Sequence, residues 1–109
     1  MAYDEYLAER IQKVLADKNI PCEQKKMFGG LSFMINGKMS VGIVKSELMA
    51  RVGPEFHAEA LKKEGARNMD FTGRPMEGYV FVSPDGFDSD DQLEFWVDKC
   101  VEFNKHLTS

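Results

Sequence analysis

The dipeptide Asn36-Gly37 limits what this chain can fold into more than any other short stretch. A type I′ turn needs positive φ at two successive residues, and Asn followed by Gly tolerates that conformation best. Apolar residues recur at every second position on both sides of the pair, at Leu31, Phe33 and Ile35 before it and at Met39, Val41 and Ile43 after it. The pattern predicts an antiparallel hairpin with one buried face.

The same period of two continues in residues 48–52, where the even positions are apolar and alternate with Met49 and Arg51. Because successive side chains of a strand point to opposite faces, Met34 and Met49 are expected on the face away from the main apolar set. Residues 25–28 and 79–82 predict two further strands. Residues 66–78 are expected to form a loop with one short strand around 69–71.

Three segments predict helices. The first carries an apolar stripe at three-to-four spacing, made by Tyr3, Tyr6, Leu7, Ile11, Val14 and Leu15, and Pro21 cannot continue it. Pro54 is expected in the first position of a second helix that stops at Gly65. Ser89 and Gln92 fit a capping box at the start of the third helix.

The expected order is one helix, three or four strands, a second helix, one or two strands and a last helix. This order indicates an α+β fold of two layers, with helices packed on an antiparallel sheet, in a single domain over residues 1–109. The chain is 43% hydrophobic and 29% charged, which is ordinary for a globular protein. No apolar run approaches the ~20 residues that span a bilayer, and the polar first residues do not resemble a signal peptide. We therefore expect a cytoplasmic protein.

Gly29-Gly30 raises the alternative of a phosphate-binding loop. Such a loop needs its glycines between a strand and a helix N-terminus, where backbone N–H groups converge on the anion. Here a predicted strand follows, so we interpret the pair as a bend or bulge between strands. The two cysteines and two histidines are scattered without metal-ligand spacing, so we expect reduced thiols, no metal and no cofactor.

Three stretches carry a family likeness: KKMFGGLSFMINGKMSVGIV, ELMARVGP and GARNMDFTGRPMEGYVFV. They resemble the N-terminal domain family of the TfoX/Sxy competence regulators, and the likeness runs from about Tyr6 to Trp96. The resemblance implies a two-layer α+β domain in transcription regulation, where members assist another transcription factor. Larger members add a helical C-terminal domain, so the chain resembles a stand-alone version.

The segment from Arg67 to Met76 is the densest group of unusual residues. Arginines beside methionine and aromatic side chains are typical of interface cores. The alternative is a loop pinned by an arginine–aspartate pair, with the apolar residues closing the edge of the core. We predict a non-enzymatic interaction surface that includes Phe28, Met34, Met49, Arg51, Arg67, Asp70, Arg74 and Met76.

We expect another protein as the partner, and a homodimer is an alternative because a short meander leaves strand edges unpaired. Nucleic-acid binding would need one contiguous surface of Lys25, Lys26, Arg51, Lys62, Lys63, Arg67 and Arg74, and the net charge of −4 disfavours it. A small-molecule or enzymatic site would need a pocket on which His57, Arg67 or Asp70 converge. Catalysis by Cys22 or His57 would also need a base and an orienting partner.

Overall fold

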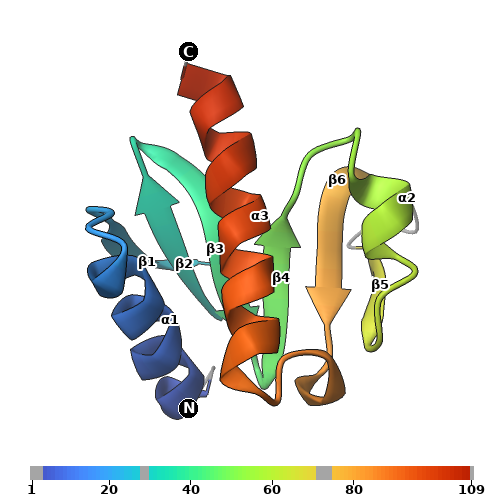
Figure 1. Cartoon of the computed structure of the whole chain (residues 1–109), viewed down its shortest axis with the longest axis horizontal. Helices are drawn as coiled ribbons and strands as arrows, with labels where there is room; N and C mark the ends of the chain where they lie inside the picture. Colours follow the sequence, from blue (N-terminus) through green and yellow to red (C-terminus); the bar gives the residue numbers. More distant parts are fainter. Residues whose placement is uncertain (1–3, 28–29, 71–74, 109) are drawn as a thin grey trace.

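The computed structural model of the chain describes residues 4–27, 30–70 and 75–108 (Figure 1). Its elements follow in the order α1 (Glu5–Asp17), β1 (Glu23–Met27), β2 (Gly30–Ile35), β3 (Lys38–Val44), β4 (Glu47–Arg51), α2 (His57–Ala60), β5 (Ala66–Asp70), β6 (Pro75–Val82), η1 (Pro84–Gly86) and α3 (Asp90–Thr108). The strands form one antiparallel sheet with the order β1-β2-β3-β4-β6-β5. The predicted α+β fold, with an antiparallel sheet, is confirmed.

The described helices lie on one face of the sheet. Figure 1 shows α3 crossing the middle of that face, with α1 beside it and the short α2 over β5 and β6. One core fills the space between the two layers. It takes inward side chains from β2, β3, β4 and β6, and the largest of them are Phe33, Ile43 and Leu48. Trp96 of α3 is 1% exposed and closes this core from the helix side.

The predicted turn at Asn36-Gly37 is confirmed. Asn36 has φ 55° and Gly37 has φ 77°, so both adopt the positive φ that a type I′ turn requires. The side chain of Asn36 donates a hydrogen bond of 3.0 Å to Oδ1 of Asn104 in α3. The turn therefore sets the register of β2 and β3 and also contacts the last helix.

The corner between β1 and β2 contains the glycine pair of the sequence. Met27 pairs with Gly30, which begins strand β2 rather than a helix, while Gly29 lies outside the described residues. A Cβ atom on Gly30 would lie 1.9 Å from the carbonyl oxygen of Ile43. Glycine is therefore required at position 30 because β3 packs directly against it, which supports the predicted bend between strands.

Several local predictions were wrong. The second helix contains only His57–Ala60: residues 54–56 form a turn, and after Ala60 the N–H groups of Lys62 and Lys63 bond carbonyl oxygens three positions back, so the α-helix does not continue. The segment expected as a loop forms most of the β5–β6 hairpin. Tyr6, expected in the apolar stripe of α1, is 69% exposed, and Leu7, Ile11 and Leu15 make the buried stripe.

The predicted capping box of α3 is confirmed. Oγ of Ser89 accepts a hydrogen bond from the N–H of Gln92 at 3.1 Å, and Oε1 of Gln92 accepts one from the N–H of Ser89 at 3.0 Å. Trp96 Nε1 then donates to the carbonyl oxygen of Gly86 at 3.1 Å. These bonds fix where α3 begins and how it is rotated over the sheet.

Candidate functional site

The sequence-predicted surface residues that the structure describes lie on the sheet face opposite the helices, which we call the helix-free face. Met49 and Phe81 are cross-strand neighbours there and form a second apolar cluster, apart from the main core. Met39, Val44 and Tyr79 pack around this pair and are each half-buried. Met49 and Phe81 are themselves buried, at 1% and 8% exposure, so solvent reaches this cluster at the half-buried Met39, Val44 and Tyr79. The cluster is built by β3, β4 and β6.

The two methionines singled out by strand alternation have different environments. Met34 is half-buried and pairs with Met39 across β2 and β3. Met49 is only 1% exposed, and its methyl group lies above Gly42, where a Cβ atom would be 2.7 Å away. A partner would therefore contact Met34 and Met39 directly, and Met49 would pack beneath them.

Arg51 is held by three groups at one end of the helix-free face. Its Cζ atom lies 5.3 Å from the ring centroid of Tyr79 and 5.4 Å from that of Phe103. Its Nη1 atom donates to the carbonyl oxygen of Met39 at 3.3 Å. A guanidinium fixed between two rings has little rotamer freedom left to lose on binding.

Arg67 occupies the other side of the apolar cluster. Its Cζ atom lies 4.9 Å from the ring centroid of Phe81, and its guanidinium forms an ion pair with Glu47. The Arg67 side chain is 53% exposed and that of Glu47 is 28% exposed. Among the described residues the partner of Arg67 is thus a glutamate of β4, and Arg67 lies on a strand rather than in a loop.

The remaining predicted surface residues are only partly covered by the structure. The backbones of Asp70 and Met76 lie in β5 and β6, and their side chains are outside the described part of the chain. Phe28 and Arg74 lie outside the described residues altogether. Their predicted role in the surface therefore stays a prediction.

Two buried hydroxyl groups belong to the same region of the sheet. Ser32 pairs with Gly42 on the helix-free face, and Ser40 precedes the inward-facing Val41. Each serine is 1% exposed, and neither Oγ atom has a hydrogen-bond partner among the described residues. A buried hydroxyl without a hydrogen-bond partner lowers the free energy of unfolding, so the effect of these two groups on stability can be measured.

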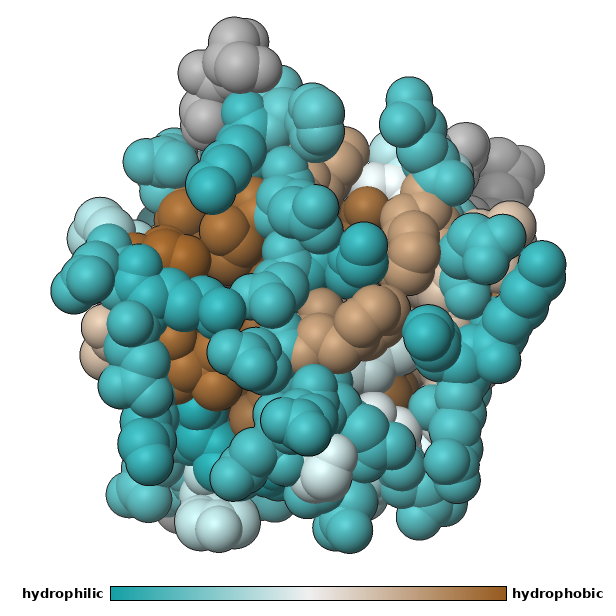
Figure 2. All heavy atoms as spheres, viewed as in Figure 1, coloured by the Kyte–Doolittle hydropathy of each residue, from teal (hydrophilic) through white to brown (hydrophobic). Residues whose placement is uncertain are grey.

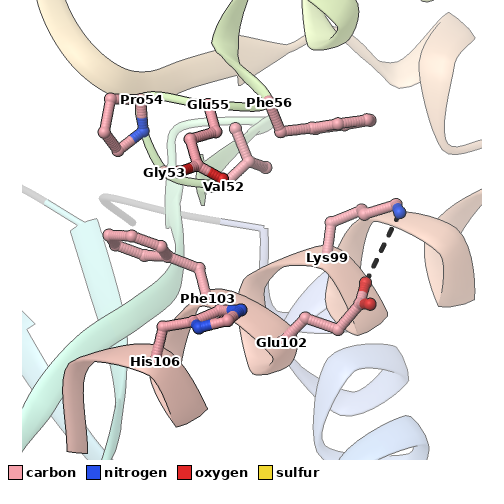
Figure 3. A pocket seen from close by; sticks show the side chains of 9 residues that line it. All are labelled: Val52, Gly53, Pro54, Glu55, Phe56, Lys99, Glu102, Phe103 and His106. Carbon is pink, nitrogen blue, oxygen red and sulfur yellow. Dashed lines mark ion pairs between the residues drawn. The ribbon is translucent and has the colours of Figure 1, made fainter.

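A cavity of about 330 Å³ lies on the helix side of the molecule, between residues 52–56 and the C-terminal half of α3 (Figure 3). Its walls come from Pro54, Glu55 and Phe56 above and from four residues of α3 below, namely Lys99, Glu102, Phe103 and His106. Sequence reasoning missed this cavity. The three-to-four spacing of the four α3 residues was its only local signal, and the partner segment lies more than 40 positions away.

Aromatic rings and lysine side chains continue the cavity toward the start of α3. The rings of Phe56 and Phe95 lie 6.1 Å apart, and Lys99 Nζ lies 4.8 Å from the Phe56 centroid. Lys63 and Lys99 both approach Phe95, with Nζ atoms 4.6 Å and 5.7 Å from its centroid. Figure 2 shows this area as hydrophobic surface between α3 and α2, bordered by hydrophilic residues.

Cys22 and His57 lie at opposite edges of the sheet. Nδ1 of His57 accepts the N–H of Gly78 at 3.0 Å, so its other nitrogen carries the proton and faces Oδ1 of Asn68 at 2.9 Å. Cys22 precedes β1, and partial burial raises the pKa of its thiol. His57 thus holds α2 against the β5–β6 hairpin, and the structure does not bring it near Cys22.

The basic residues of the middle segment are also separated. Lys25 and Arg67 lie in one cross-strand row of the helix-free face but on opposite edge strands, about 24 Å apart at ordinary strand spacing. Lys62 and Lys63 follow α2 on the other side of the sheet. Within the described ranges, no group of three or more His, Cys, Asp or Glu side chains could hold a metal, and no helix could cross a membrane.

Comparison with protein families identifies residues 15–104 as a TfoX N-terminal domain. The chain belongs to this family. The match begins at the end of α1 and ends within α3, so it contains the helix-free face and the residues that line the cavity of Figure 3 apart from His106. Searches of curated proteins and of solved structures gave no match.

Proposed function

We propose that this TfoX N-terminal domain is a non-enzymatic regulatory module that docks another protein through its helix-free face. One observation carries the proposal: an apolar cluster on that face lies between two arginines, each held against an aromatic ring. Arginine, methionine and aromatic residues are the types enriched at the centres of protein interfaces. Methionine side chains also adapt their shape to a partner.

The two arginines indicate what the partner presents. Arg51 is oriented by Tyr79, Phe103 and Met39, so its ordering cost is already met before binding. Arg67 has an exposed ion pair with Glu47, and such pairs contribute little stability, so a partner carboxylate can replace Glu47. We therefore expect a protein surface with apolar residues in its centre and acidic residues at its border.

We propose that the domain acts by binding and not by catalysis. His57 is occupied by Gly78 and Asn68, and the raised pKa of Cys22 disfavours the reactive thiolate at neutral pH. The two candidates are separated by the width of the sheet. These observations support a binding role, and a homodimer through the edge strands β1 and β5 stays a separate prediction.

The test is affinity capture with the tagged chain, followed by binding measurements with the purified partner. Arg67→Ala combined with Arg51→Ala should weaken binding about tenfold or more, which corresponds to about 1.4 kcal/mol. The control is Lys26→Ala, which removes one positive charge from β1 at a position paired with inward-facing Leu31. Equal binding by the double variant and the wild type would contradict docking at this face.

Fluorescence anisotropy with duplex DNA, single-stranded DNA and RNA tests the alternative function. We expect no saturable binding, because the described basic residues do not form one contiguous surface: Lys25 and Arg67 lie on opposite edge strands, and Lys62 and Lys63 lie on the other side of the sheet. Saturable binding that falls steeply between low and physiological salt would instead indicate a nucleic-acid-binding module.

A further inference from the structure

Two hollows lie along α3 on the opposite side of the sheet from the helix-free face, and the contact between the rings of Phe56 and Phe95 separates them. We call the two hollows and the ring contact between them the α2–α3 groove. Pro54, Phe56, Lys99 and Phe103 line one hollow, and Lys63, Phe95 and Trp96 line the other. The cavity of Figure 3 forms one end, and a second hollow of about 370 Å³ beside Gly86, Gln92 and Trp96 forms the other. From Gln92 to His106 the helix rises about 21 Å, which matches about six residues of extended chain.

The middle of the groove carries positive charge. Lys63 and Lys99 bring their ammonium groups to the same ring, that of Phe95. Lys63 has no ion-pair partner among the described residues. Lys99 has Glu102 at 3.4 Å, but that carboxylate is 63% exposed, and such a pair contributes little. An anionic group between the two lysines would gain charge–charge attraction without displacing a strong internal partner.

Each end of the groove is lined by carboxylate side chains together with apolar ones. Glu55 and Glu102 border the cavity of Figure 3, and Glu64 and Asp91 border the other hollow. A nucleic-acid strand would place phosphates along the whole channel, against the carboxylates at both ends. A ligand that fits has its negative charge in the middle and apolar groups on either side.

We propose that the α2–α3 groove binds an extended acidic peptide segment of another protein. A central Asp or Glu lies between Lys63 and Lys99, and one large apolar side chain enters each end hollow. The end cavity of about 330 Å³ is at the small end of ligand pockets, so it suits one side chain rather than an extended cofactor. In its wall the ring of Phe103 packs against Gly53, where a Cβ atom would lie 2.4 Å from the ring.

Selection from a displayed library of random hexapeptides against the full chain tests the proposal without choosing a ligand in advance. We expect enriched peptides with Asp or Glu at the centre and aromatic or leucine side chains on both sides. Binding of one enriched peptide is then measured by the fluorescence anisotropy of a dye attached to the peptide. Enrichment of basic peptides, or of none, would overturn the proposal.

Matched lysine variants locate the site. Lys63→Ala should weaken the selected peptide about three- to fivefold, the range of an exposed charge pair, and Lys63→Ala combined with Lys99→Ala should weaken it further. Lys62→Ala is the control, because Lys62 is adjacent in sequence, 73% exposed and paired with Glu59. Equal loss in the Lys62 and Lys63 variants would refute the groove, as would tighter binding of adenosine monophosphate than of the peptide. Loss of peptide binding in Arg67→Ala, whose side chain contacts Phe81 and Glu47 and, among the described residues, none that lines the groove, would assign the peptide to the helix-free face instead.

Discussion

Asn104 of α3 donates a hydrogen bond of 2.9 Å from its side-chain amide to the carbonyl oxygen of Ile35, the last residue of β2. The same side chain accepts the bond from Asn36, so one buried residue, 2% exposed, connects the helix to the hairpin turn. This contact orients the C-terminal half of α3, which supplies Phe103 to Arg51 and Lys99 to the α2–α3 groove.

Asn104→Ala should lower the free energy of unfolding by about 2 kcal/mol, because it leaves the buried carbonyl of Ile35 without this donor. For a domain of this size the melting temperature should fall by about 10 °C. Urea denaturation followed by circular dichroism measures the change. Gln24→Ala, which removes an exposed amide bonded to Gln12, is the control and should change stability by less than about 0.5 kcal/mol. Equal effects of the two changes would contradict the role of Asn104.

Gly30→Ala and Gly37→Ala separate a steric cost from a conformational one. A methyl group on Gly30 would collide with the backbone of β3, so we expect a loss of about 3 kcal/mol or an insoluble protein. At Gly37 nothing lies within 4 Å, and only the φ of +77° penalises alanine, by about 1 kcal/mol. Chemical denaturation of both variants gives the comparison. A larger loss for Gly37→Ala than for Gly30→Ala would show that Gly30 does not pack tightly against β3.

The fold could be predicted where the signals are local. The turn at Asn36-Gly37, the alternation around Met49 and the capping box at Ser89 depend on residues a few positions apart, and the structure contains all three. The β5–β6 hairpin was predicted only in part: a strand was expected over 79–82, but the glycine and proline residues of 66–78 suggested a loop there. Its strand conformation depends on pairing between Asn68 and Val80 and of β6 with β4, which a local pattern does not encode.

The candidate surfaces could be predicted only in part for the same reason. Strand alternation placed Met34, Met49 and Arg51 on one face, but not the ring of Phe103 against Arg51. The α2–α3 groove joins Phe56 to Phe95 and Lys99, which are about 40 positions away. Helical periodicity predicts which side of α3 faces the core. It does not predict which segment of the chain packs beside the other sides of the helix.

The buried thiol of Cys100 makes the free energy of unfolding depend on pH in the alkaline range. Burial raises the pKa of Cys100 from its ordinary 9.0 to about 12 in the folded protein. Between these values the unfolded chain loses the proton and the native state keeps it. Stability is therefore fully present below pH 9 and falls as pH rises toward 12, by about 1.4 kcal/mol per pH unit. Comparing the wild type with Cys100→Ala at pH 8 to 11 tests this, because the variant should lack the added slope. Parallel stability curves would contradict it.

Ser32→Ala and Ser40→Ala test the interior of the helix-free face. Both Oγ atoms are buried without a hydrogen-bond partner among the described residues, so removing either hydroxyl should raise the free energy of unfolding by about 1 kcal/mol. Ser46→Ala, at an exposed position before β4, is the control and should be neutral. If Ser32→Ala instead lowers stability by 1 kcal/mol or more, its hydroxyl is bonded in solution. Partner binding by the same serine variants is then measured. We expect it to be unchanged, because docking should depend on Arg51 and Arg67 and not on the two buried serines.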